Sequence, residues 1–221
     1  ADARRDRATR RLLADPYALN PEGQRHGPDG RDPSGVRFDA DIGAWTGPFV
    51  MASINTRVVR RTNALLGSRY GRGFQYVEVS RFGAGLKGRV TAMVVTGLLG
   101  AFVAAASRRA TRALLQATVL PDPGEGPDRE ARESGFFTMR LVGKRGGTTV
   151  LEGRVAGSMD PGYGQTAVML GESALSLALD RLESPGGVLT PATAMGPHLL
   201  ERLRGQSMVF EVLDPRERAL S

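Results

Sequence analysis

The chain has 221 residues, and 41% of them are hydrophobic, enough for the core of one large domain with or without an extended arm. It has no cysteine and only two histidines, which excludes disulfides and thiolate metal sites and argues against a histidine metal site. The net charge of +7 is almost all arginine and favours acidic partners such as carrier proteins, phosphate groups or anionic lipid. Aromatic residues, at 6%, do not alternate with the arginines, so we expect no nucleic-acid binding.

Residues 1–47 are predicted to be an arginine-rich arm followed by a strap. The first 13 residues have the composition of a helix end, whereas residues 15–47 are rich in proline, glycine and aspartate. No secretory signal is recognised, because the first apolar stretch is only Leu12 to Ala14, so we expect a cytoplasmic location. Residues 48–221 are predicted to form one domain.

That domain should begin with a helix from Pro48 to Leu66, because proline suits the first helical position and Gly67 suits the end. Its core stripe is expected to consist of Met51, Ile54, Val58 and Leu65. A second face carries Arg57, Arg60 and Arg61. This arginine face is either solvated or a contact for phosphate groups or an acidic partner protein.

Residues 74–82 are predicted to be a strand, and residues 90–106 a helix without any charge. A membrane-spanning helix needs roughly 20 apolar residues, so this run is short. We expect it to be buried in the protein or in a homodimer interface. The alternative is peripheral contact with the inner face of the plasma membrane, because basic residues flank the run at both ends.

The second half of the chain should contain a loop at 120–135, a hairpin with strands at 137–142 and 148–155, and a last strand at 208–212. A short helical piece is expected to start at Thr190–Pro191 and to end at Gly205. This order of elements predicts an α+β fold with a largely antiparallel sheet packed with helices.

The central element is predicted to be a helix within Met159 to Asp180, entered through a turn at 160–165. Its narrow polar stripe consists of Gln165, Met169, Glu172, Ser173, Ser176 and Asp180, and the rest is apolar. Such a helix is expected to be buried on most sides and to form one wall of a site. Glu172 is either a general acid or base or the partner of an arginine. Tyr163 is a candidate proton donor.

Residues 162–167, GYGQTA, fit the G-x-G-x-x-G/A pattern of dinucleotide-binding loops. The fit is incomplete, because Pro161 stands where a buried parallel strand should end and Asp180 lies on the same helix. We therefore interpret the turn as a close-packing turn, or as amides at 164–166 that face an anionic or carbonyl group of a substrate. On the second interpretation Tyr163, Gly164 and Gln165 line the substrate cleft.

The segments DPGYGQTAVMLGESALSLALD (160–180) and GGVLTPATAMG (186–196) resemble the C-terminal part of the saccharopine dehydrogenase-like oxidoreductases. The closest resemblance is to their mycobacterial branch, the trans-acting enoyl reductases. Further blocks at 48–65 and 123–136 look similar to the same family. The resemblance covers most of the chain beyond Trp45.

The resemblance implies the substrate and dimerisation domain of a reductase whose Rossmann half is absent from these residues. NADP(H) would be bound mainly by that half, and no residue here is assigned to cofactor or metal. The substrate would be an acyl chain on a carrier protein or polyketide synthase, in lipid biosynthesis. Asn55 and Asn63, in one matching block, are expected to contact it, and this chain alone should be inactive. The alternative is a non-catalytic module that binds lipid, a membrane surface or an acyl carrier protein.

Overall fold

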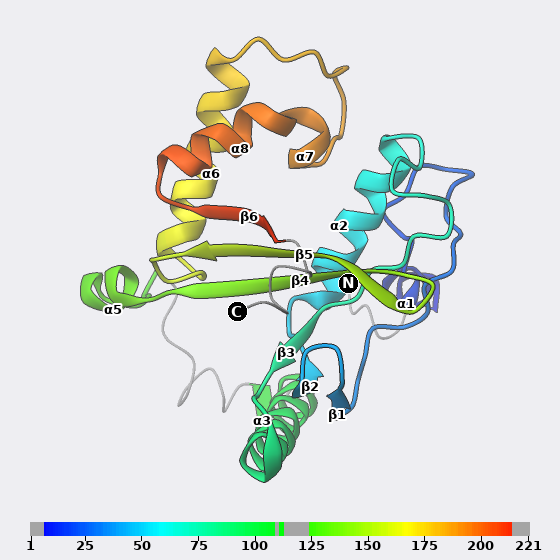
Figure 1. Cartoon of the computed structure of the whole chain (residues 1–221), viewed down its shortest axis with the longest axis vertical. Helices are drawn as coiled ribbons and strands as arrows, with labels where there is room; N and C mark the ends of the chain where they lie inside the picture. Colours follow the sequence, from blue (N-terminus) through cyan, green and yellow to red (C-terminus); the bar gives the residue numbers. More distant parts are fainter. Residues whose placement is uncertain (1–6, 109–110, 113–123, 214–221) are drawn as a thin grey trace. The chain divides into compact units, whose positions relative to one another are not determined.

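The computed structural model describes residues 7–108, 111–112 and 124–213. By its internal contacts the chain forms two compact units, unit 1 (Ala1–Leu120) and unit 2 (Pro121–Ser221). Each unit contains one small three-stranded sheet, antiparallel throughout, together with helices (Figure 1). The predicted α+β class with antiparallel sheets is therefore confirmed. The division into residues 1–47 and 48–221 stays a prediction.

Unit 1 contains, in chain order, α1 (Arg7–Ala14), β1 (Arg37–Asp39), β2 (Ala44–Pro48), α2 (Ala52–Leu65), β3 (Val79–Arg81) and α3 (Gly85–Ala106). β2 is the central strand and pairs with β1 and β3. Two strands thus lie in or reach into the segment predicted as loop from its composition. The predicted helix start is also wrong, because Pro48 ends β2 opposite Val79 and α2 begins only after Met51.

The buried face of α2 is not the predicted one. It carries Ala52, Thr56 and Arg60 at four-residue spacing, whereas Met51 and Ile54 of the predicted stripe are exposed. The reason is electrostatic, since Arg60 forms an ion pair with Asp29 and so holds the proline- and glycine-rich segment against this side of the helix. α2 therefore buries a polar stripe and leaves apolar side chains on its surface.

Helix α3 begins at Gly85, five residues before the predicted helix, and ends at Ala106 as predicted. It lies beside the sheet of unit 1 (Figure 1). Glycines permit this close packing. A Cβ atom at Gly88 would lie 2.3 Å from the Gly83 carbonyl oxygen, and one at Gly47 would lie 2.7 Å from Thr96 Oγ1. Only Gly88 and Ala92 of α3 are buried, so the expectation of a helix buried in the protein is wrong for the described chain. A homodimer interface stays a prediction.

Unit 2 contains α5 (Arg129–Ser134), β4 (Phe137–Arg145), β5 (Thr148–Gly157), α6 (Gly164–Leu179), α7 (Pro191–Ala194), α8 (Gly196–Gly205) and β6 (Val209–Leu213). The predicted hairpin and last strand are confirmed, with β5 between β4 and β6. The hairpin turns at Gly146 and Gly147, whose φ angles of +57° and +82° favour glycine. α5 was not predicted. It starts where the Asp128 carboxylate accepts a hydrogen bond from the Ala131 amide.

The sheet of unit 2 has one charged and one apolar face. On the charged face, Arg140 pairs with Glu152, and Arg154 pairs with Glu211 on the neighbouring strand. The strand register places the apolar side chains on the opposite face, namely Met139, Leu141, Val155, Phe210 and Val212. This face is only partly covered in the structure, because Met139, Leu141 and Val212 are exposed.

Helix α6 begins beside the end of β5, and α8 packs along it (Figure 1). Its buried residues are Gly164, Gln165 and Ser176, whereas Leu170, Leu177 and Leu179 are exposed. The prediction of a helix buried on most sides is therefore wrong. The polar stripe of α6 faces α8, because Arg202 of α8 forms ion pairs with Glu172 and Asp180 of that stripe. The apolar side chains of α6 therefore lie on the surface.

The junction between α6 and β5 is a tight contact that a single methyl group should disturb. In Gly157→Ala the new Cβ would lie 2.5 Å from both Gln165 Oε1 and Phe137 Cε1, so we expect a loss of about 1–3 kcal/mol of unfolding free energy. Urea titration followed by far-ultraviolet circular dichroism measures it. The control is Gly171→Ala, where a Cβ meets nothing within 4 Å. It should stabilise α6 by about 0.5–1 kcal/mol, and an equal effect of both variants would contradict the contact.

Candidate functional site

A buried ion pair organises the polar residues of unit 1. Arg60, 3% exposed, donates from Nε to Asp29 Oδ2 at 2.7 Å. It also donates to the Pro16 and Tyr76 carbonyl oxygens and to Thr56 Oγ1. Its guanidinium group lies over the Tyr17 ring, 5.6 Å from the centroid. Every side of this cation therefore has an internal partner, and Arg60 does not form part of a solvated face.

The other two predicted arginines also contact the segment that covers α2. Arg57 forms an ion pair with Asp32 at 3.4 Å and donates to the Asp15 carbonyl oxygen. Arg61 donates to the Leu19 carbonyl oxygen. The arginines thus attach the segment at 15–32 to α2 through hydrogen bonds and ion pairs with its carbonyl and carboxylate oxygens. A contact of Arg57 or Arg61 with an external anion stays a prediction.

A second buried group in unit 1 is the Glu78 carboxylate, which is 8% exposed. It accepts hydrogen bonds from the Tyr76 hydroxyl at 3.0 Å and from the Asn55 side-chain amide at 3.0 Å. Burial, and then the charge of Glu78, raises the pKa of Tyr76 well above its usual range. The phenol therefore stays protonated as a donor, and the predicted substrate residue Asn55 is a partner of this carboxylate.

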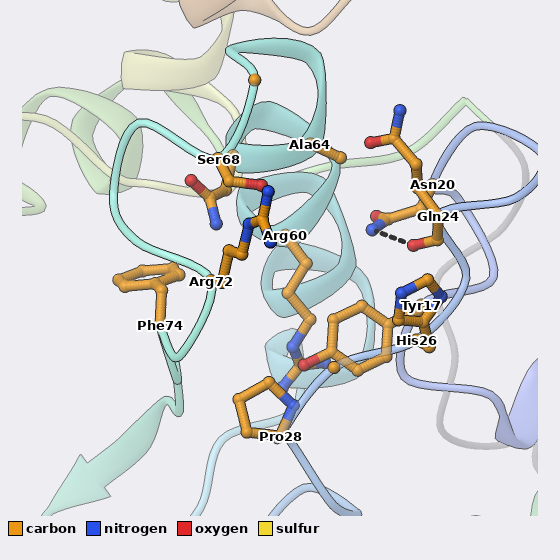
Figure 2. Close-up of a pocket in the computed structure, with 13 residues that line it drawn as sticks. Tyr17, Asn20, Gln24, His26, Pro28, Arg60, Ala64, Ser68, Arg72 and Phe74 are labelled. Carbon is orange, nitrogen blue, oxygen red and sulfur yellow. Dashed lines mark hydrogen bonds between the residues drawn. The ribbon is translucent and has the colours of Figure 1, made fainter.

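A cavity of about 500 Å³ lies over α2 in unit 1. Figure 2 shows Tyr17, Asn20 and His26 on one side of α2 and Arg72 and Phe74 on the other. Asn20 is 6% exposed and donates from Nδ2 to the Gln24 carbonyl oxygen. Its Oδ1 atom is buried and has no hydrogen-bond partner among the described residues. An unpaired buried acceptor of this kind is costly in a folded protein.

Two predicted residues, Arg60 and Asn63, line this cavity. The Asn63 side chain accepts a hydrogen bond from the Tyr70 amide and donates to the Gly71 carbonyl oxygen. It therefore fixes the loop after α2, which forms one edge of the cavity. In the structure Asn63 shapes the cavity through this loop, and direct contact with a substrate stays a prediction.

In unit 2, the N-terminus of α6 is capped by the chain itself. Asp160 Oδ2 accepts hydrogen bonds from the Tyr163 and Gly164 amides, and the Asp160 carbonyl oxygen accepts one from the Gln165 amide. Hydrogen bonds from backbone amides to the carboxylate, first that of Tyr163 and then those of Gly162 and Gly164, lower the pKa of Asp160. The expectation that the amides of Gly164 and Gln165 are free for a substrate anion is wrong, because Asp160 already occupies them.

The remaining residues of this turn have two different environments. Gln165 is 2% exposed and packs over Gly157 of β5. Tyr163 is 55% exposed, and its ring lies beside Gly126 of the preceding loop. Of the two, Tyr163 is the side chain that an external substrate can reach, and Gln165 belongs to the junction of α6 with the sheet.

Glu172 is the partner of an arginine, which is the second of its two predicted interpretations. Arg202 of α8 lies 3.4 Å from Glu172 Oε2 and 2.7 Å from Asp180 Oδ1, and Gln206 donates to Glu172 Oε1. The bidentate bonds of Arg202 hold the pKa of Asp180 well below its usual range. This network fastens α8 to the polar stripe of α6, and in this state Glu172 is not a free acid or base.

The Asp180 pair predicts how the stability of unit 2 depends on pH. Because the folded-state pKa of Asp180 is depressed, its contribution is present above the unfolded pKa of about 4 and is lost as the pH falls further. The hydrogen-exchange protection factors of α6 and α8, which correct for the intrinsic pH dependence of amide exchange, should therefore fall below about pH 4. In Asp180→Asn both helices should already exchange faster at neutral pH, with a weaker acid dependence. An acid dependence unchanged in this variant would contradict the assignment.

The described residues provide neither a metal-binding cluster nor a dinucleotide-binding turn. Within residues 7–108, 111–112 and 124–213, no group of three or more His, Asp or Glu side chains could hold a metal ion. The turn at 162–167 follows β5, a strand of an antiparallel sheet, and a carboxylate occupies the helix N-terminus where a pyrophosphate would lie. The described residues therefore do not fit NADP(H) at this turn.

The predicted site residues are divided between the two units. Asn55, Asn63 and the three arginines lie in unit 1, whereas Tyr163, Gly164, Gln165 and Glu172 lie in unit 2. Sequence reasoning missed Asn20, Asp29 and Arg202, each of which has a partner or a cavity that lies far away in sequence. Asp160 could have been found, because an aspartate just before a helix is a common cap.

The structure thus defines an α+β protein with one polar cavity in unit 1 and a capped, partly exposed helix in unit 2. In sequence the chain is a relative of the mycobacterial proteins named trans-acting enoyl reductases, as residues 160–180 and 186–196 predict. No protein-family model and no solved structure matches the chain.

Three relatives illustrate the similarity. A Mycobacterium tuberculosis H37Rv protein, provisionally named a trans-acting enoyl reductase, is 43% identical over 216 residues, which are 91% of this chain and 50% of that protein. The trans-acting enoyl reductase of Mycobacterium bovis BCG is 38% identical over 93% of this chain and 51% of its own length. That of Mycobacterium ulcerans is 38% identical over 87% and 48%. The chain thus spans about half the length of the curated relatives it matches.

Proposed function

We propose that this chain is the acyl-substrate side of an NADPH-dependent trans-acting enoyl reductase, and that a Rossmann domain outside these residues binds the cofactor. The reaction would be reduction of the carbon–carbon double bond of an enoyl thioester on a carrier protein or polyketide synthase in lipid biosynthesis. The observation that carries the proposal is the match of most of this chain to about half of proteins with that name.

The proposal that NADPH binds outside these residues is supported by the turn before α6, whose amides are already hydrogen-bonded to Asp160. A pyrophosphate needs free amides at a helix N-terminus, and Asp160 brings a competing negative charge to that place. When bound in the complete enzyme, NADPH would supply the hydride. The part proposed for the present chain is to hold and orient the thioester.

Two features suit such a substrate. The cavity over α2, with the polar side chains of Tyr17, Asn20 and His26 in its lining, suits the amide and hydroxyl groups of a pantetheine arm. In unit 2, the exposed side chain of Tyr163 would donate a hydrogen bond to a carbonyl oxygen, and the apolar arc of α6 suits an acyl chain or a second copy in a homodimer. The net charge of +7 favours an acidic carrier protein in the cytoplasm.

The second candidate function is a non-catalytic module that binds lipid or a carrier protein. The observation that favours it is the exposed apolar surface of α3, which no step of a reduction requires. The two candidates differ in one measurable property, since only the first predicts specific affinity for an enoyl thioester.

Titration calorimetry of the 221-residue chain with an enoyl-pantetheine thioester, and separately with NADPH, tests the proposal. We expect saturable thioester binding that Asn20→Leu weakens, and no saturable NADPH binding. Absence of thioester binding by the folded chain would leave the substrate assignment without support and favour the second candidate.

A further inference from the structure

The longest helix of the described chain, α3, presents a wide apolar surface. Its 22 residues meet the length and composition of a membrane-spanning segment, yet almost none of it is buried. At 1.5 Å per residue it is roughly 33 Å long, close to the thickness of a hydrocarbon core. Its only charged residues are Lys87 and Arg89, near its start.

The apolar surface is too wide for one helical partner. Gly88, Ala92 and Thr96 recur every four residues and form the side that packs inside unit 1, where Gly88 lies against the Gly83 carbonyl group and Thr96 lies against Gly47 of β2. At 100° per residue, the exposed apolar side chains cover roughly 200° of the remaining circumference. That arc consists of Leu86, Val90, Met93, Val94, Val95, Leu98 and Phe102, and Val103 near the end of α3 is exposed on the side of Ala92 and Thr96. A coiled-coil seam fills a much narrower stripe, whereas lipid chains, which have no fixed shape, cover an arc of any width.

Contacts within unit 1 argue for a helix that lies on a membrane rather than one that crosses it. β2, the central strand of the sheet, packs along the first half of α3, so lipid cannot surround that half without displacing the sheet. Beyond Thr96 the helix is open, since a Cβ at Gly97 or at Gly100 would meet nothing within 4 Å. The exposed arc is thus accessible along the whole length from one side.

Charges at both ends complement an anionic surface. Lys87 and Arg89 are exposed near the start of α3, and Arg108 is exposed just after its end. Arg89 lies over the Trp45 ring, 5.2 Å from the centroid, which places an aromatic side chain and a cation together. Such pairs are typical of the boundary between lipid headgroups and acyl chains.

We propose that unit 1 binds the surface of an anionic lipid membrane through α3. The arc of Val90, Val94 and Leu98 enters the boundary between headgroups and acyl chains. Lys87 and Arg108 contact lipid phosphates at the two ends. This proposal does not depend on the proposed enzymatic function, because it rests on α3 alone.

Vesicle flotation of the 221-residue chain tests the proposal. We expect the chain to float with phosphatidylcholine vesicles that contain phosphatidylglycerol, and less with phosphatidylcholine alone. The double variant Val94→Glu, Leu98→Glu should lower binding roughly tenfold or more, because both side chains leave water on binding. Lys87→Gln with Arg108→Gln should lower binding by about fivefold per charge, only with the anionic vesicles.

The matched control is Leu177→Glu with Leu179→Glu, which places the same charges on the exposed arc of α6. It should float like the original chain, and circular dichroism should show all variants folded. Equal flotation of the α3 variant and the original chain would overturn the proposal. So would a dimer that buries α3 in solution and does not float, or bound chain that resists extraction by alkaline carbonate as a spanning protein does.

Discussion

Replacing Arg60 by methionine is expected to destabilise unit 1 by about 3–5 kcal/mol, because the change leaves the Asp29 carboxylate buried without its cation. Both side chains are at most 4% exposed, so solvent cannot replace the lost partner. The same change removes the hydrogen bonds to the Pro16 and Tyr76 carbonyl oxygens. The segment that covers α2 would then lose its main attachment to the helix.

The chain provides a specific probe for this measurement. Its single tryptophan, Trp45, lies in β2 of unit 1, so its fluorescence during urea titration reports that unit. Arg69→Met is the control, because Arg69 is exposed in the loop after α2, and it should change the unfolding free energy by less than about 0.5 kcal/mol. Equal losses in both variants would contradict a central role of the ion pair.

Local signals in the sequence predicted many of the elements. The hairpin follows from Lys144–Gly147 between two alternating strands, and the helix after Thr190 follows from a threonine–proline start that forms a capping box in the structure. The strands β1 and β2 were missed, because a segment rich in proline and glycine carries no alternation and its pairing is set by contacts with β3. Element type was predictable where the signal lay within a few residues.

The direction of burial was not predictable from periodicity. The rule that the apolar face of a helix is inside fails for α2 and α6, because each buries a polar stripe against a charged partner. For α2 that partner is Asp29, 31 residues before Arg60, and for α6 it is Arg202, 30 residues after Glu172. A single sequence does not show which distant charges meet.

The residues of the candidate site were likewise predictable only where a local sequence signal marked them. Tyr163 was found because it stands in a glycine turn before a helix, whereas Asn20 lies in a segment without any recognisable motif. The resemblance to the trans-acting enoyl reductases was predictable, because residues 160–180 and 186–196 form contiguous blocks. The cavity over α2 was not, since its lining residues come from positions between 17 and 74.

We also expect that the 221-residue chain alone does not bind NADPH saturably. A dinucleotide site needs a parallel strand that leads into a glycine turn, free amides at the helix N-terminus, and a residue on the next strand that contacts the ribose. Here the turn follows an antiparallel strand, and Asp160 is bonded to the amides of Tyr163 and Gly164. We therefore expect the glycines of this turn to serve the packing of α6.

Titration of NADPH into the folded 221-residue chain, by calorimetry and by nicotinamide fluorescence, tests whether this chain belongs to the substrate side of the enzyme. Circular dichroism of the same sample establishes that the chain is folded, and the enoyl-pantetheine thioester serves as the positive ligand. We expect heat release and saturation with the thioester, and neither with NADPH. Saturable one-to-one binding of NADPH that Gly164→Val abolishes would show that the turn before α6 is a cofactor loop, and would contradict the assignment of this chain to the substrate side.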